Sequence, residues 1–199
     1  MQKSLEKRKL QYNKTCKNKE EKLEIIRDEL KKNNINVNIF IGNEIFINEN
    51  IVNLVENGYI ETLGDTNCLL IELPFHNKII GLLDIISEIK SAGYLPIIAH
   101  PERYTYFQDD YSLVDELRGE KVLFQCNYTS IIGRYGDSAE KLLKYMLKHR
   151  YVDYLGTDLH RVDRTTLIDN WKKIDKLFNK VAGKDYYEKI KRNCDFLVS

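Results

Sequence analysis

A parallel α/β fold is the class that the sequence predicts, and three observations support it. Apolar strand-like segments and amphipathic helical segments alternate five times along the chain. The strand-like segments lack a clean polar alternation, as expected when helices cover one sheet face and a packed interior covers the other. The 199 residues, 43% of them hydrophobic, suffice for one core and are short for two. We therefore expect a single domain over residues 1–199.

The first expected elements are a charged helix and a strand. Residues 17–33 carry apolar side chains at helical spacing among Glu and Lys. Residues 37–42 predict a strand that runs into Glu44. A short helix is expected over residues 49–56, and a buried strand over residues 69–73.

The same alternation continues to the end of the chain. An amphipathic helix is expected over residues 78–92, because Gly93 is a common helix-ending residue. The remaining strands are expected over residues 95–100, 122–127 and 152–157, and the remaining helices over residues 111–117, 138–149, 165–181 and 184–192.

Residues able to bind a metal follow four of the five expected strands. They are Glu44, Glu72, His100 and the pair Asp158 and His160. The carboxyl ends of parallel strands converge on one face, where ligands and catalytic groups gather. Carboxylate and imidazole groups together suit Mn, Fe or Zn. The pattern therefore predicts a metal site at this end of the sheet.

Each of these residues also has a purely structural interpretation. Glu44 could pair with a helix N-terminus or lie in solvent at the rim of the sheet. His100, Asp158 and His160 could be ordinary polar strand ends. Glu72 is harder to explain in this way, because it interrupts an apolar strand and an unpaired buried carboxylate is costly. The recurrence at equivalent places favours the metal site.

Two arginines lie close to these residues in the sequence. Arg103 follows His100 by three positions, and Arg164 follows His160 by four. A guanidinium matches phosphate geometry and stays charged, so either could hold a phosphomonoester. The structural alternative for each arginine is a surface ion pair, with Glu102 or Asp163 as partner.

Composition and motifs exclude several function classes. The formal charge is only +1, from 31 basic and 30 acidic residues, which gives no support for nucleic-acid binding. No apolar run approaches the roughly 18 residues of a transmembrane helix, and the polar N-terminus is no secretion signal. We therefore expect a cytoplasmic protein. The four cysteines form no CxxC pair, and residues 133–136 predict a turn with no nucleotide fingerprint.

Several segments of the chain together resemble one family. In order, they are I-G-N-E-I, L-I-E-L-P-F, P-I-I-A-H-P-E-R-Y, Q-C-N-Y-T-S-I-I-G-R-Y-G and G-T-D-L-H. They are similar to the bacterial PHP-family (polymerase and histidinol phosphatase) tyrosine-protein phosphatases of the CpsB/CapC/YwqE type, from about Lys17 to the C-terminus. The resemblance implies a distorted TIM-like (βα) barrel with a cluster of up to three metals. It implies Mn²⁺ above all, with Fe, Zn, Mg or Co as alternatives.

The resemblance also assigns roles to individual residues. Arg103 falls on a family arginine that engages phosphate. Arg164 matches a second one less closely, because this chain has Arg-Thr-Thr where the family usually has Arg-Pro-Pro. The residues that fall on family metal-ligand positions are Glu44, Glu72, His100, Asp158 and His160.

The chain departs from the family pattern near its N-terminus. Family members begin with a strand that carries Asp-x-His-x-His, and a second strand ends in Pro-His. Neither motif occurs at the start of this chain, so we expect an N-terminally incomplete barrel that lacks three ligand histidines. The chain is then either a fragment or a degenerate relative, and a partner chain or homo-oligomer could close its core.

The resemblance implies metal-dependent hydrolysis of phosphotyrosine on a protein. The expected substrate is the tail of a tyrosine kinase that regulates capsule or exopolysaccharide biosynthesis. Arg103 and Arg164 would hold the phosphate, and His160 is one candidate for the proton donor. Two alternatives stay open: a PHP hydrolase of a small phosphomonoester such as histidinol phosphate, and an inactive PHP-fold binding protein.

Overall fold

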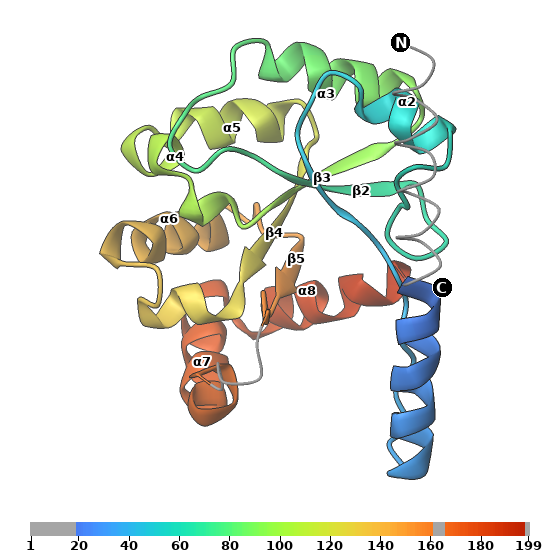
Figure 1. Ribbon diagram of the computed structural model, residues 1–199. Coiled ribbons are helices and arrows are strands. Elements are labelled where there is room, and N and C mark those ends of the chain that lie inside the picture. Colours follow the sequence, from blue (N-terminus) through green and yellow to red (C-terminus); the bar gives the residue numbers. More distant parts are fainter. Residues whose placement is uncertain (1–18, 161–165, 198–199) are drawn as a thin grey trace.

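The computed structural model describes residues 19–160 and 166–197. Five parallel strands form one sheet in the order β1-β2-β3-β4-β5 (Figure 1). Within the described residues the sheet is open, with β1 and β5 at its edges. This confirms the predicted parallel α/β class. The strands are β1 (Glu44–Phe46), β2 (Cys68–Glu72), β3 (Leu95–Ala99), β4 (Leu123–Asn127) and β5 (Tyr154–Gly156).

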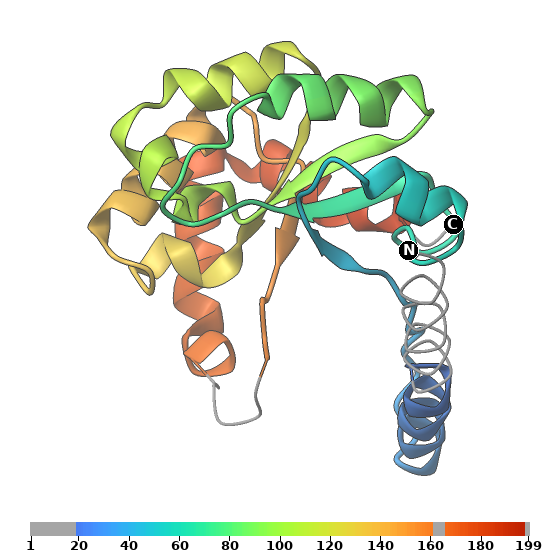
Figure 2. The same ribbon diagram turned by 45° about the horizontal axis from the view of Figure 1, so that its top comes forward.

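Helices connect the strands and follow the last one. Residues 19–32 are also helical, and this helix projects away from the sheet (Figures 1 and 2). The other helices are α2 (Ile51–Glu56), α3 (Leu82–Ser91), α4 (Thr105–Asp109), α5 (Ser112–Gly119), α6 (Asp137–Lys148), α7 (Thr166–Ala182) and α8 (Lys184–Phe196), with 3₁₀ turns η1 (Pro101–Arg103) and η2 (Tyr128–Ile132). Among the helices of the described ranges, none is both long and apolar enough for a membrane span.

The main core lies between the sheet and the helices. Side chains alternate between the two faces of a strand, and Leu69, Ile71, Ile98 and Phe124 are buried in this core. The opposite face carries a smaller apolar cluster around Cys68, Ile97 and Tyr154. That face is only partly covered, since Phe46 of β1 is 56% exposed. The packed interior expected on this face is therefore incomplete in the described structure.

The strand predicted over residues 37–42 is wrong. The first strand lies further along, at β1, and Val37 and Phe40 are exposed. The Ile41 carbonyl accepts a hydrogen bond from the backbone N–H of Gly64, which belongs to a loop. The shift to β1 places Ile45 in the core and Glu44 opposite Leu70 of β2.

Two further differences concern helices. The helix predicted to start at residue 78 begins at Leu82, because Gly81 has a φ of 76°, outside the helical region. The sequence did not predict α4 or the turns η1 and η2, which follow the ends of β3 and β4. The other strands and helices lie within a few residues of the predicted ranges.

A buried tyrosine ties the ends of β2 and β3 together. The Tyr104 hydroxyl donates to the Ala99 carbonyl at 2.8 Å and accepts from the Leu73 N–H at 2.9 Å. Its side chain is fully buried, and this burial raises the pKa of the Tyr104 hydroxyl well above the usual value. Because Glu72 and His100 adjoin the two bonded backbone groups, the hydroxyl fixes the spacing of these strand ends.

Replacing Tyr104 by Phe should lower the free energy of unfolding by about 1–3 kcal/mol, because two buried backbone groups lose their partner. Urea unfolding measures this change. The matched control is Tyr94→Phe, at a partly buried tyrosine before β3, which should change stability by less than about 0.5 kcal/mol. Equal effects of the two substitutions would contradict the role of the Tyr104 hydroxyl.

The difference between wild type and Tyr104→Phe should also depend on pH. The Tyr104 hydroxyl has a higher pKa in the folded protein than in the unfolded chain, where it is about 10. Its contribution to stability is therefore fully present at pH values below about 10. That contribution is lost as the pH rises above the unfolded value. The gap in unfolding free energy between the two proteins should therefore be constant from pH 6 to 9 and shrink above pH 10.

Candidate metal centre

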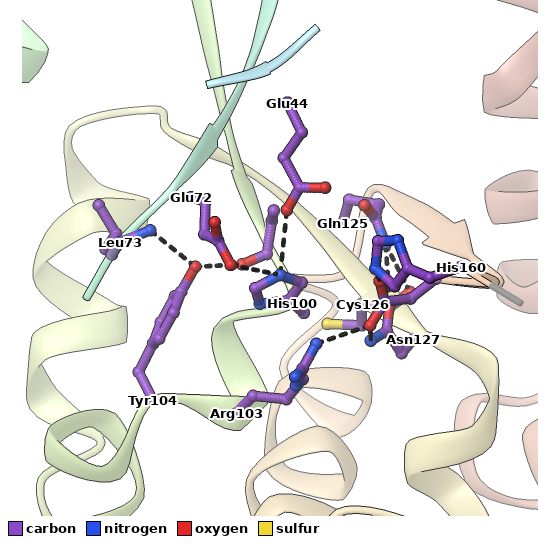
Figure 3. A network of polar contacts seen from close by, with 12 residues as sticks. Glu44, Glu72, Leu73, His100, Arg103, Tyr104, Gln125, Cys126, Asn127 and His160 are labelled. Atoms are coloured by element: carbon purple, nitrogen blue, oxygen red, sulfur yellow. Dashed lines mark hydrogen bonds and ion pairs between the residues drawn. The ribbon is translucent and has the colours of Figure 1, made fainter. Parts of the chain in front are cut away.

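Three predicted ligands from three neighbouring strands meet at one point (Figure 3). Glu44 begins β1, Glu72 ends β2, and His100 directly follows β3. His100 Nε2 lies 3.1 Å from Glu44 Oε1 and 3.6 Å from Glu72 Oε1. The ligand atoms of all three residues lie within 4.8 Å of one another. We call these three residues the strand-end cluster.

His100 is the most constrained member of the strand-end cluster. Its backbone N–H donates to the Gln125 carbonyl at 2.7 Å, and its φ of 32° lies in the left-handed region. Such a conformation costs a non-glycine residue about 1–3 kcal/mol and often marks functional sites. The side chain is only 4% exposed, and the Phe75 ring stacks on it at 5.6 Å.

The donor set of the strand-end cluster fits a divalent cation. Two carboxylates and one imidazole are ligands that Mn, Fe and Zn accept. The separations of 3.1 Å and 3.6 Å between His100 Nε2 and the two carboxylate oxygens are compatible with bonds of about 2.0–2.2 Å to one ion. The buried Nδ1 of His100 has no hydrogen-bond partner within residues 19–160 and 166–197, so packing and the glutamates hold the imidazole there. Glu44, Glu72 and His100 could therefore hold the metal.

Asp158 is the common hydrogen-bond and ion-pair partner in a second cluster of side chains. Its Oδ2 accepts from Arg103 Nη1 at 2.6 Å, Asn127 Nδ2 at 3.1 Å and the Tyr135 hydroxyl at 3.2 Å. Its Oδ1 lies 2.6 Å from His160 Nε2. The Asp158 side chain is 9% exposed, whereas that of His160 is 68% exposed. Like His100, Asp158 has a left-handed φ, of 48°.

The predicted five-ligand site is thus divided in two. Asp158 and His160 pair with each other, and neither joins the strand-end cluster in the described part of the chain. Arg103 connects the strand-end cluster with the Asp158 cluster. It follows His100 by three residues, and its side chain forms an ion pair with Asp158. Its partner is Asp158 rather than Glu102, the partner named in the structural alternative. Arg164 lies outside the described residues.

Glu102 has a separate, buried role that the sequence did not reveal. Its Oε1 accepts from the Asn127 N–H at 2.8 Å and from Ser130 Oγ at 2.7 Å. The carboxyl is fully buried, and this desolvation raises the pKa of Glu102 above its usual range. Glu102 therefore fastens the turn after β3 to the end of β4, next to the Asn127 side chain that binds Asp158.

Several other site residues were not predicted as such. Asn127 ends β4, and its side-chain amide donates a hydrogen bond to Asp158. Phe75 and Tyr135 both contact the Arg103 guanidinium, with ring centroids 4.8 Å and 4.4 Å from Cζ. The available signals were the Pro74-Phe75 step after β2 and the glycine-flanked turn that contains Tyr135.

A comparison with models of protein families gives one match over most of the chain. The model described as capsular polysaccharide synthesis, CpsB/CapC, matches residues 6–197. The chain belongs to the CpsB/CapC family. This confirms the resemblance found in the sequence motifs.

Individual relatives agree with this assignment. CapC of Staphylococcus aureus is 30% identical over 174 residues, which are 85% of this chain and 66% of the relative. Tyrosine-protein phosphatase YwqE of Bacillus subtilis is 25% identical over 131 residues, 66% of this chain and 52% of the relative. Tyrosine-protein phosphatase CpsB of Streptococcus agalactiae is 24% identical over 144 residues, 70% of this chain and 59% of the relative. The chain thus spans about half to two thirds of the length of these relatives.

A solved structure shows the same fold. It comes from work on YwqE of Bacillus subtilis and CpsB of Streptococcus pneumoniae, described as metal-dependent tyrosine phosphatases. The TM-score is 0.80 at 22% identity, and the match covers 89% of this chain and 71% of the other. The likeness confirms the PHP-type fold that the sequence resemblance implied.

Glu72→Gln should weaken Mn²⁺ binding by about tenfold or more, because the substitution keeps the shape of the side chain and removes a ligand charge. The electron paramagnetic resonance signal of free Mn²⁺ measures the affinity without reference to activity. The control is Glu56→Gln, an exposed glutamate of α2, which should bind as wild type does. If both variants retain wild-type affinity, the strand-end cluster is not the metal site.

Proposed function

We propose that the chain is a metal-dependent phosphatase that hydrolyses phosphotyrosine on a protein. The observation that carries this proposal is the strand-end cluster of Glu44, Glu72 and His100 with Arg103 beside it. Membership of the CpsB/CapC family supports the same activity, since several relatives are named tyrosine-protein phosphatases.

The strand-end cluster is the proposed metal-binding group, with Asp158 and His160 as further ligands and Mn²⁺ as the metal. A divalent cation bound there would supply Lewis acidity and offset negative charge on the phosphoryl oxygens. The other contributions come from the side chains around it.

Arg103 is proposed to hold the phosphoryl group. Among the described residues its side chain donates a hydrogen bond only through Nη1, to Asp158. A guanidinium has five N–H donors in a rigid fork, so the remaining donors can bind phosphate oxygens while Asp158 fixes the side chain. Arg164 is proposed as a second phosphate-binding arginine.

In the arrangement where His160 pairs with Asp158 and leaves the metal to the other ligands, its imidazole is proposed as the proton donor to the leaving phenolate. Its imidazole is mostly exposed, and its Nε2 is oriented by the Asp158 carboxylate. A tyrosine leaving group has a pKa of about 10, so it needs less protonation than an alkoxide. No covalent phosphoenzyme is required.

The biological setting is also part of the proposal. The expected substrate is a tyrosine kinase that regulates capsule or exopolysaccharide biosynthesis, in keeping with the description of the family. A cytoplasmic location, one phosphatase domain over residues 1–199 and assembly into a homo-oligomer stay predictions.

With Mn²⁺ added, the chain should hydrolyse a phosphotyrosine peptide and leave histidinol phosphate largely intact. Phosphate release measures both reactions. His100→Ala should abolish turnover because it removes a proposed metal ligand. Arg103→Ala should lower kcat/KM by about 10²–10³-fold because it removes a donor to the phosphoryl oxygens. The control is Lys176→Ala, on an exposed part of α7.

Circular dichroism should show that the variants remain folded. The proposal would be contradicted if the wild-type chain showed no Mn²⁺-stimulated hydrolysis, or if His100→Ala hydrolysed the peptide as fast as the wild type. Preference for histidinol phosphate would replace the protein substrate by a small phosphomonoester.

A further inference from the structure

The turn between η2 and α6 delivers an aromatic side chain to the candidate site. Gly133 and Gly136 have φ values of 76° and 92°, and the Gly136 N–H donates to the Gly133 carbonyl at 3.0 Å. Glycine adopts these positive φ values without strain. The sequence predicted a turn here with no nucleotide fingerprint, and Tyr135 lies inside it.

Tyr135 contacts both members of the Arg103–Asp158 ion pair. Its ring centroid lies 4.4 Å from Arg103 Cζ. Its hydroxyl donates to Asp158 Oδ2 at 3.2 Å, the same oxygen that accepts from Arg103 Nη1. One side chain therefore restrains the guanidinium through its ring and the carboxylate through its hydroxyl.

Phe75 makes a comparable double contact on the side of the strand-end cluster. Its ring lies 4.8 Å from Arg103 Cζ and stacks on the His100 imidazole. The Phe75 carbonyl accepts from both the N–H and the hydroxyl of Thr105, at 2.9 Å and 3.1 Å, which anchors its backbone. We call Phe75 and Tyr135 the aromatic clamp.

An unrestrained arginine side chain populates many rotamers. When it binds an anion it must adopt one rotamer, which costs conformational entropy. Aromatic faces attract a guanidinium and restrict its plane. We propose that Tyr135, acting with Phe75, is a positioning residue that orients Arg103 for phosphate binding and keeps Asp158 aligned with it. This inference rests on the phosphate-binding role of Arg103 in the proposed function.

Two substitutions separate the two contacts of Tyr135. Tyr135→Phe keeps the ring and removes the hydroxyl, whereas Tyr135→Leu removes both. The matched control is Tyr151→Leu, because Tyr151 is also partly buried and its ring lies 5.8 Å from Arg118, outside the site. Urea unfolding establishes that each variant is folded.

The first measurement is the NMR signal of the Arg103 Nε–H group, assigned by its loss in Arg103→Lys. Ring currents of the aromatic clamp should displace this signal in the wild type and in Tyr135→Phe. In Tyr135→Leu the signal should move toward the position of a free arginine, and in Tyr151→Leu it should not change. An unchanged signal in Tyr135→Leu would overturn the proposal.

The second measurement is the Kd of inorganic phosphate, from shifts of backbone amide signals that can be followed in every variant. It should rise about fivefold or more in Tyr135→Leu, about twofold in Tyr135→Phe, and not at all in Tyr151→Leu. Wild-type affinity in Tyr135→Leu would also overturn the proposal. If Arg103→Lys binds phosphate as the wild type does, the phosphate-binding role in the proposed function fails, and the Arg103 signal still decides whether Tyr135 orients this side chain.

With active enzyme, the same variants give a third readout. The loss in Tyr135→Leu should fall on KM for a phosphotyrosine peptide more than on kcat, because the ring orients a binding group. A loss confined to kcat, with unchanged KM and phosphate Kd, would contradict a role through Arg103.

Discussion

The turn from His100 to Arg103 is the constraint on which the rest of the candidate site depends. His100 leaves β3 in a left-handed conformation, and the Arg103 N–H donates back to the His100 carbonyl at 3.0 Å. The side chains of the turn consequently diverge: His100 contacts the two glutamates, Glu102 bonds to the end of β4, and Arg103 reaches Asp158 beyond β5. One short turn therefore connects groups from every strand of the described sheet.

Electrostatics explains why the predicted ligands form two groups rather than one. Glu44 and Glu72 have a single imidazole between them, so their negative charge favours a cation at that point. Asp158 already has a guanidinium, an amide, a phenol and an imidazole around its two oxygens. A metal bound to Asp158 would have to replace or rearrange some of these partners. The strand-end cluster is therefore the part of the site best prepared for a metal.

The sequence could predict the location of the site because parallel strands fix where their carboxyl ends lie. Apolar runs marked four strands to within two residues or so, and Glu72 stood out because it interrupts one of these apolar runs. Glu44 is an exception, since it begins β1 rather than following a strand. The strand expected before it was misplaced because pairing with β2 decides which residues of that segment become β1.

Contacts made through space could not be read from the chain. Tyr104, Glu102 and Tyr135 reach groups between 5 and 31 residues away in sequence, and no local pattern encodes such a meeting. The sequence also did not show that Asp158 and His160 would lie apart from the strand-end cluster. That separation goes with the ion pair between Arg103 and Asp158. Glu102 precedes Arg103 in the sequence, which made it the obvious ion-pair partner. In the structure its buried carboxylate instead accepts hydrogen bonds from Asn127 and Ser130.

The central claim is that side chains from separate strand ends form one cation site, and anomalous diffraction at the manganese edge tests it most directly. Crystals grown with Mn²⁺ should show an anomalous peak about 2.0–2.3 Å from carboxylate oxygens of Glu44 and Glu72 and from His100 Nε2. A peak held by other residues, or no peak at this position at saturating Mn²⁺, would contradict the account.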